Sequence, residues 1–169
     1  PDIVSMEMPH NNGETDIKSC YNALNESVSV KVASGFYDNG KDNDLPTMIG
    51  LIEIFDGKTG APLCVMDGSL ITGIRTGAAG AISSELLSRK DSKTVAVIGG
   101  GGQARMQIYG LCQVRDIQTV KVFSPYPEEL PQYKADVEKE TGVKVIICQT
   151  VEEAMEDADI AISTTPSKD

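Results

Sequence analysis

The sequence predicts an α/β protein built on a Rossmann-type parallel sheet, and two observations carry this prediction. The first is a short apolar run, Thr94 to Ile98, which ends in four consecutive glycines and continues with helical spacing. The second is a regular alternation of apolar strands and helices after that point. Alternation of this kind is typical of a doubly wound parallel sheet with right-handed crossover connections.

The elements of this second half can be placed from their periodicity. The glycines open a helix from Gln103 to Val114, because Ala104, Ile108 and Leu111 share one helical face. The later elements are a strand at 120–123, a helix at 127–140, a strand at 143–147, a short helix at 151–158 and a strand at 160–162. We therefore expect a dinucleotide-binding domain over residues 91–169, incomplete because a whole domain would usually continue beyond this fourth strand.

Residues 1–90 follow a different pattern, in which glycine turns rather than helices join the strands. The segment Ser27 to Val32 alternates valine with polar residues, which indicates a half-buried strand. Strands at 49–55 and 63–66 flank a hairpin turn with two glycines. Ser69 can cap a helix that runs to about Ser88. These elements predict a smaller N-terminal α+β domain.

The glycine turn matches the pattern that binds a dinucleotide. Gly99, Gly101 and Ala104 occupy the G-x-G-x-x-G/A positions. The first allows a tight turn, the second lets the backbone approach a pyrophosphate, and the third packs helix on strand. The phosphates would then meet the free amides and the positive end of the helix. Four glycines could also form a flexible loop, but the strand before them and the helix after them favour a nucleotide site.

The first half contains two basic residues, Arg75 and Lys31, that could be functional or ordinary surface residues. Their spacing in the sequence does not decide between these roles. Arg75 precedes a run of small residues in the expected helix. Glycine costs about 1 kcal/mol relative to alanine inside a helix, so Gly77 and Gly80 suggest a close packing partner or a ligand. Lys31 points away from its neighbours Val30 and Val32, and an exposed strand lysine is the common case.

Composition and charge disfavour several classes of function. The 169 residues carry a formal net charge of −10, whereas nucleic acids and anionic membranes require a basic patch. The absence of a long apolar run and of a secretory signal favours a soluble, cytoplasmic protein. His10 is the single histidine, so a histidine-based triad or a metal site is not expected. Cys20, Cys64, Cys112 and Cys148 form no C-x-x-C pair, and we expect buried, reduced thiols.

Several separated segments carry a resemblance that the glycine turn alone would not establish. They are 31–36 with Asp38 and Asn39, then 45–47, 73–79 and 97–104. In this order they resemble the ornithine cyclodeaminase/mu-crystallin family, over nearly the whole chain. The segment from Pro9 to Lys18 is most similar to the branch associated with ectoine utilisation.

The resemblance implies an enzyme that uses NAD or NADP and acts on a small amino acid. Family members oxidise an α-amine to an imine or reduce an imine, and cyclodeaminases continue with ring closure and loss of ammonia. Three alternatives stay open: a cyclodeaminase lyase, an amino-acid dehydrogenase or imine reductase, and a non-catalytic, cofactor-bound binding protein such as mu-crystallin. The resemblance also implies a homodimer, with residues 1–90 serving substrate binding and dimerisation.

The resemblance further implies roles for individual residues. Lys31 would be catalytic and lie beside the reacting amine, where a desolvated lysine could relay a proton. Arg75 would bind the substrate carboxylate, which suits the guanidinium fork. The residues implied in cofactor binding are Thr47, Arg75, Thr76, Gly99, Gly101, Gly102, Gln103, Ala104, Ser124 and Thr165.

Some positions depart from the family pattern or fall outside the chain. Ser124 stands after the second strand, where NAD-preferring members tend to have an acid, and no arginine follows nearby to bind a 2′-phosphate. NAD and NADP therefore both stay open. A further carboxylate-binding arginine of the family would fall near Ile3, where none is found. The family's catalytic aspartate should lie beyond Asp169.

Overall fold

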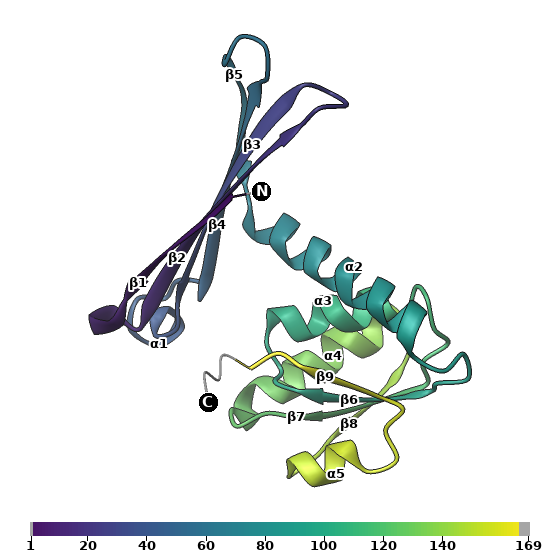
Figure 1. Ribbon diagram of the computed structural model, residues 1–169. Coiled ribbons are helices and arrows are strands. Elements are labelled where there is room, and N and C mark those ends of the chain that lie inside the picture. Colours follow the sequence, from purple (N-terminus) through teal and green to yellow (C-terminus); the bar gives the residue numbers. More distant parts are fainter. Residues whose placement is uncertain (1, 166–169) are drawn as a thin grey trace. The chain divides into compact units, whose positions relative to one another are not determined.

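The computed structural model describes residues 2–165, which belong to two compact units, Pro1–Thr72 and Gly73–Asp169. The first contains a five-stranded antiparallel sheet and the second a four-stranded parallel sheet (Figure 1). The sequence predicts a boundary near residue 90, whereas the units divide inside helix α2 (Ser69–Leu87). Most of this helix groups with the second unit, because its glycines pack on helix α3 (Gly102–Leu111).

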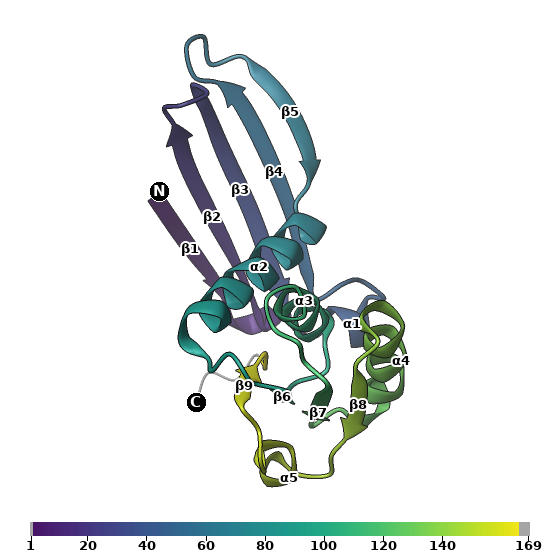
Figure 2. The ribbon, with the colours of Figure 1, turned by 90° about the vertical axis from the view of Figure 1, so that its right-hand side faces the viewer.

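The sheet of the first unit is a meander in which strands adjacent in sequence are adjacent in space (Figure 2). Its strands are β1 (Asp2–Met8), β2 (Gly13–Asn22), β3 (Ser27–Phe36), β4 (Met48–Asp56) and β5 (Pro62–Asp67). A short 3-10 helix, η1 (Pro9–Asn11), joins β1 to β2, and α1 (Asn39–Asp42) lies between β3 and β4. Strands β3, β4 and β5 confirm the predicted strands, whereas the sequence did not predict β1 and β2.

The register assigns each side chain of this sheet to one of two faces. Ile3, Lys18, Lys31, Ile52 and Met66 pair in one row across the five strands, so they share what we call the lysine face. Val28, Val30 and Val32 lie on the opposite face, the valine face, because side chains alternate along a strand. The predicted orientation of Lys31, away from its valine neighbours, is confirmed.

The second unit has the strand order β8-β7-β6-β9, which is one half of a Rossmann fold with its next strand. Its strands are β6 (Thr94–Ile98), β7 (Thr119–Phe123), β8 (Lys144–Ile147) and β9 (Ile160–Ser163). Helices α3 and α4 (Leu130–Thr141) cover one face of the sheet, and α5 (Val151–Met155) lies on the other (Figure 1). A 3-10 turn, η2 (Pro127–Glu129), precedes α4. The core is made of apolar side chains from the strands, α3 and α4, including Val95, Val97, Ile108, Val120 and Tyr133.

The glycines inside α2 serve close helix packing. A Cβ atom on Gly77 would lie 2.2 Å from the carbonyl oxygen of Met106, and one on Gly110 would lie 2.6 Å from that of Gly77. The backbones of α2 and α3 therefore approach where only glycine fits. Of the two explanations that the sequence allowed, a close packing partner is the one that the structure supports at Gly77.

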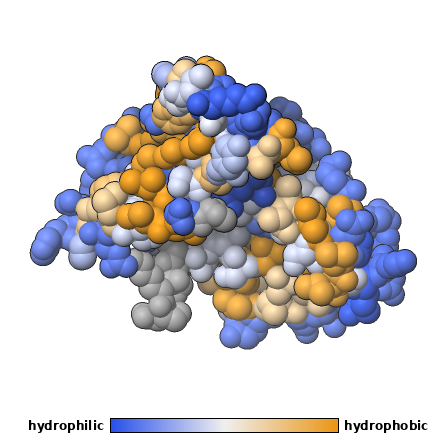
Figure 3. All heavy atoms as spheres, turned by 45° about the horizontal axis from the view of Figure 1, so that its top comes forward, coloured by the Kyte–Doolittle hydropathy of each residue, from blue (hydrophilic) through white to orange (hydrophobic). Residues whose placement is uncertain are grey.

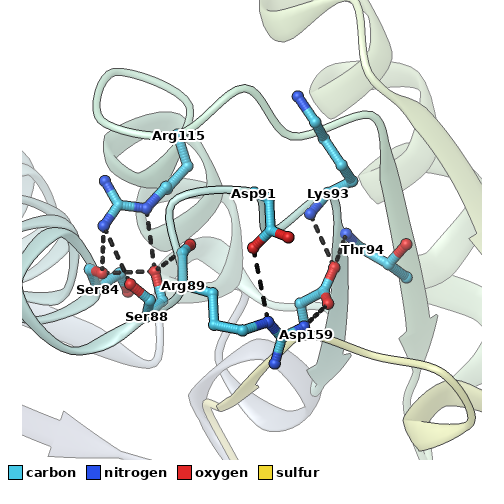
Figure 4. Close-up of polar contacts among 8 residues, drawn as sticks. All are labelled: Ser84, Ser88, Arg89, Asp91, Lys93, Thr94, Arg115 and Asp159. Atoms are coloured by element: carbon cyan, nitrogen blue, oxygen red, sulfur yellow. Dashed lines mark hydrogen bonds and ion pairs between the residues drawn. The ribbon is translucent and has the colours of Figure 1, made fainter.

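Two charged side chains tie the far end of α2 and the start of the parallel sheet together (Figure 4). The guanidinium of Arg115 donates to the carbonyl oxygens of Ser84, Glu85 and Ser88 at the C-terminal end of α2. Asp159 accepts hydrogen bonds from the amides of Lys93 at 2.8 Å and Thr94 at 2.9 Å, and it pairs with Arg89. Asp159 thus joins the beginning of β6 to the segment that enters β9.

These contacts predict an acid-sensitive link. The amides of Lys93 and Thr94, followed by the charge of Arg89, lower the pKa of Asp159. A carboxyl with a lowered pKa stabilises the fold above its unfolded-state pKa, and the stabilisation disappears as the pH falls through its folded-state pKa. We expect Asp159→Asn to lower the free energy of unfolding at neutral pH, with a difference from wild type that shrinks below about pH 4.

Urea unfolding at a series of pH values measures this difference, with the exposed neighbour Asp157→Asn as the control. A gap between wild type and Asp159→Asn that stays constant from neutral to acid pH would contradict the assigned role.

Candidate dinucleotide site

The glycine turn begins with two positions fixed by packing. Gly99 has a φ of 102°, and a Cβ atom there would lie 3.0 Å from the hydroxyl oxygen of Thr164. A Cβ atom on Gly100 would lie 2.7 Å from a methyl carbon of Leu130, the first residue of α4. The fold itself favours glycine at position 99, because of the positive φ and the nearby backbone of Thr164, whereas a side chain at position 100 would require the Leu130 methyl group to move.

The next two glycines face open space. A Cβ atom on Gly101 or Gly102 would meet no atom within 4 Å. Gly101 is the N-cap of α3 and supplies no side-chain capping bond, so the amides of the first turn are available to a ligand. The side-chain nitrogen of Gln103 is buried and finds no hydrogen-bond partner among the described residues. Open space, free helix amides and an unpaired donor fit the pyrophosphate of a dinucleotide.

The other residues of the second unit that were predicted to contact the cofactor lie in or near this turn. Ala104 is fully buried, as expected for the residue that packs helix on strand. Ser124 directly follows β7, is buried, and lies beside Gly100, where an added Cβ would be 3.9 Å from the Cβ of Ser124. Its hydroxyl oxygen accepts a hydrogen bond from the amide of Tyr126 at 3.1 Å. Thr165 is half-buried and follows Thr164, the residue packed against Gly99.

A charged cluster that the sequence did not reveal holds the turn in place. Arg105 donates to the carbonyl oxygen of Gly100 at 2.9 Å and to the carboxylate of Asp136 at 2.8 Å. Its guanidinium carbon lies 5.3 Å from the centre of the Tyr133 ring, within the range of a cation–π contact. Hydrogen bonds from Gln132 and then from Arg105 lower the pKa of Asp136, which keeps this anchor ionised. The sequence carries no pattern that predicts this cluster, because its members come from two separate helices with no fixed spacing between them.

On helix α2 the two predicted residues differ in their surroundings. The carbonyl oxygen of Thr76 accepts a hydrogen bond from the side chain of Gln107 at 3.1 Å, which links α2 to α3. Arg75, on the same helix, is exposed. Spacing by three residues places Arg75 on the helical face of Thr72.

The two predicted residues of the first unit lie at different places in it. Lys31 lies in the middle of β3 and donates from its ammonium to the hydroxyl oxygen of Thr72 at 3.1 Å. Thr72 belongs to the first turn of α2 and in turn donates to the carbonyl oxygen of Gly68 at 2.6 Å. Thr47 is exposed before β4, and its carbonyl oxygen accepts from the amide of Phe36 at 2.9 Å. The half-buried Lys31, bonded to a helix, differs from an ordinary surface lysine.

The cysteine prediction is only partly right. Cys112 and Cys148 are partly and fully buried, whereas Cys20 and Cys64 are exposed. These two lie in one row of the antiparallel sheet, because Cys20 pairs with Ser29, Ser29 with Ile54 and Ile54 with Cys64. All four thiols are free, and residues 2–165 contain no group of side chains arranged to hold a metal ion. In the same part of the chain no helix is long and apolar enough to cross a membrane.

A parallel sheet with an open glycine turn at the end of its central strand defines a dinucleotide-binding protein. The comparison with known proteins narrows this class. Residues 1–169 match the ornithine cyclodeaminase/mu-crystallin family, and the chain belongs to that family. It spans about half the length of the curated relatives it matches.

Three solved structures show how far the similarity reaches. Δ1-pyrroline-2-carboxylate reductase of Thermococcus litoralis, in complex with NADH and L-proline, is 36% identical with a TM-score of 0.92 over 96% of this chain and 50% of its own. A lysine cyclodeaminase is 30% identical with a TM-score of 0.92 over 99% and 48%. An archaeal alanine dehydrogenase dimer with bound NAD is 30% identical with a TM-score of 0.86 over 100% and 50%.

The open side of the glycine turn yields a direct test. Gly101→Val should fold normally, since an added Cβ atom meets no atom within 4 Å, but the side chain would fill the space beside the helix amides. We expect the Kd for NADH to rise at least about tenfold, which corresponds to roughly 1.4 kcal/mol. Calorimetric titration measures the affinity, and circular dichroism checks the fold.

Gly40→Val is the matched control, because Gly40 lies in the first unit and is similarly open, with one atom at 4.0 Å from an added Cβ. Equal affinity for NADH in wild type and a folded Gly101→Val variant would remove the turn from the cofactor site.

Proposed function

We propose that this chain supplies the nucleotide-binding and substrate-binding parts of a nicotinamide-dependent amino-acid enzyme. The observation that carries the proposal is the open face of Gly101 and Gly102 at the start of α3. A nicotinamide held there would supply the chemistry of hydride exchange with the α-carbon of an amino acid. The relatives that bind NADH or NAD support this cofactor class. Both NAD and NADP remain within the proposal.

The proposed residue roles follow from the family resemblance, and the chemistry of each side chain supports them. Gly99, Gly101, Gly102, Gln103 and Ala104 would hold the dinucleotide, together with Thr47, Arg75, Thr76, Ser124 and Thr165. Lys31 would lie beside the reacting amine and move its proton, since an ammonium held by Thr72 is oriented rather than free in solvent. Arg75 would also bind the substrate carboxylate with two parallel hydrogen bonds.

Two reactions share this first step. Cyclodeamination adds ring closure and release of ammonia, and it needs a substrate with a second amine. An imine reductase stops at the exchange between amine and imine, whereas an amino-acid dehydrogenase also hydrolyses the imine to a keto acid and ammonia. Relatives of both kinds have the same fold, so the fold does not choose between them.

A panel of amino acids separates these reactions. Each is incubated with the intact protein and NAD or NADP, while ammonia and reduced nicotinamide are measured together. Ammonia without net reduced cofactor indicates cyclodeamination, and reduced cofactor in step with ammonia indicates a dehydrogenase. Reduced cofactor without ammonia, from a cyclic amino acid such as L-proline, indicates an imine reductase. Bound cofactor with neither product for any amino acid would instead support a non-catalytic binding protein.

We also infer the organisation around this site. Residues 1–90 would form the substrate and dimerisation part and residues 91–169 the nucleotide-binding part. The four free thiols support a cytoplasmic location, because structural disulfides are rare in that compartment.

A homodimer through the valine face of the antiparallel sheet completes the proposal. Val4, Met6, Ile49, Leu51 and Val65 lie on this face by register and are exposed. Figure 3 shows that apolar side chains also gather in patches on the surface it draws. Exposed apolar patches of this kind mark interaction surfaces, and the alanine dehydrogenase relative is a dimer.

The dimer is tested by charging the valine face. Leu51→Asp and Val65→Asp should shift the protein from dimer to monomer in sedimentation velocity, because an unpaired carboxylate would be buried between two copies. Leu24→Asp is the control, since Leu24 is 98% exposed in the turn between β2 and β3. A wild-type protein that sediments as a monomer at all concentrations would refute the proposed interface.

Two substitutions of Arg75 separate the effect of its guanidinium geometry from the effect of its charge. Arg75→Lys keeps the charge but loses the fork, so we expect the KM for the amino acid to rise about ten- to a hundredfold, as for a lost charged hydrogen bond. Arg75→Met removes both features and should be only slightly worse. Steady-state kinetics that place Arg75→Lys level with wild type would show that Arg75 does not bind the carboxylate.

A further inference from the structure

Two lysines face each other across neighbouring strands on the lysine face. Lys18 of β2 pairs directly with Lys31 of β3 in the antiparallel register. The other members of their row, Ile3, Ile52 and Met66, are apolar. Directly opposed side chains have Cβ atoms about 5 Å apart, and like charges in such a pair destabilise a sheet. The Lys18–Lys31 pair therefore favours a negatively charged group nearby that offsets the repulsion between the two ammonium groups.

The surroundings of Lys31 raise the positive potential further. Its ammonium is held by Thr72, in the first turn of the 19-residue helix α2. The N-terminal end of a helix is its positive end, which favours anions and disfavours cations. Lys18, Lys31 and this helix end therefore all favour a negatively charged group at the same place.

One carboxylate holds Lys18 in position. The ammonium of Lys18 is 2.8 Å from Asp16, whose other oxygen accepts from the hydroxyl of Ser5 at 2.6 Å. The bond from Lys18, then that from Ser5, lowers the pKa of Asp16, and the charge of Lys31 acts in the same direction. The side chains of Lys18 and Asp16 are 37% and 32% exposed, so a small molecule can reach them. Glu14, further along β2, accepts from the hydroxyl of Tyr37 at 2.8 Å.

We propose that Lys18 binds substrate beside Lys31 and selects amino or imino acids whose side chain carries no positive charge. The inference rests on the proposed function, because it takes Lys31 to mark the position of the reacting amine. A substrate side chain that extends over the sheet from Lys31 meets the ammonium of Lys18 at the adjacent strand. That ammonium repels a second amine, whereas it attracts a carboxylate and can donate to a carbonyl oxygen.

The inference has a consequence for the reaction. Ring closure by a cyclodeaminase requires a diamine such as ornithine, which the Lys18 ammonium would disfavour. The position of Lys18 therefore favours the amino-acid dehydrogenase or imine reductase of the two proposed reactions. Asp16 offsets only part of this positive charge, because its single carboxylate interacts with the ammonium groups of both Lys18 and Lys31.

Three amino acids with the same carbon chain test the charge preference. L-norvaline, L-glutamate and L-ornithine differ in the end of the side chain, which is neutral, negative or positive. Calorimetric titration into the intact protein saturated with NADH measures binding without oxidation, since the cofactor is already reduced. We expect norvaline and glutamate to bind at least about fivefold more tightly than ornithine.

Variants of Lys18 assign the preference to this residue. Lys18→Met should reduce the ratio of ornithine Kd to norvaline Kd towards one, Lys18→Glu should invert it, and Lys18→Arg should retain it. Lys58→Met, which removes another lysine of the same unit, should leave the ratio as in wild type. A merely structural role would change all three affinities together and leave their ratios alone.

The outcomes separate this inference from the proposed function. Tighter binding of ornithine by wild type, or an unchanged ratio in a folded Lys18→Glu variant, would overturn the role of Lys18 while leaving the nicotinamide enzyme intact. Failure of wild type to bind any of the three amino acids, with NADH still bound, would overturn both the inference and the substrate part of the proposed function.

Discussion

Gly99 turns the chain at the end of the central strand with a φ of 102°, a conformation that other residues adopt at a cost. Its amide donates to the carbonyl oxygen of Phe123 at the end of β7, and Ile98 before it accepts from the amide of Thr164 after β9. The turn is thus fastened on both sides to neighbouring strands. Gly100 is closed off by Leu130, and Arg105 holds its carbonyl oxygen. The open positions 101 and 102 are therefore presented by a rigid frame, and a ligand would find its amides already placed.

The elements of the second half follow from the sequence because short apolar strands alternate with helices, and the first strand, β6, is buried on both faces. A continuous apolar run such as Val95–Ile98, bounded by helical periodicity, has few alternative readings. Strands β1 and β2 escaped prediction because their residues are mostly exposed or half-buried and alternate polar with apolar weakly. Prediction from the sequence also missed an interaction of Ser69, which was expected only to cap the helix. Its hydroxyl accepts from the amide of Gly50 at 3.1 Å, a tertiary bond that no capping pattern reveals.

Some residues of the candidate site could be predicted from the sequence, and others could not. The glycine turn, Ala104 and Ser124 were predictable, since each is defined by its distance along the chain from a strand end. Arg105 and Asp136 are 31 residues apart and meet only through the packing of α3 on α4. Lys18 required the register of β2 against β3, which cannot be known before β2 itself is recognised. The roles of Lys31 and Arg75 came from family resemblance, because spacing alone left both open to a surface role.

The position of β9 beside β6 also sets the order in which the chain can fold. Asp159 and Thr94, which join the two strands, are separated by 65 residues in sequence, so this pairing requires closure of a long loop. The antiparallel meander pairs only consecutive strands. Its contacts are therefore local in sequence and can form before those of the parallel sheet. Completion of the parallel sheet must wait for β9, because loop-closure entropy slows contacts of high sequence separation. Until β9 arrives, the edge of β6 that it covers keeps its backbone amide and carbonyl groups unpaired with a strand.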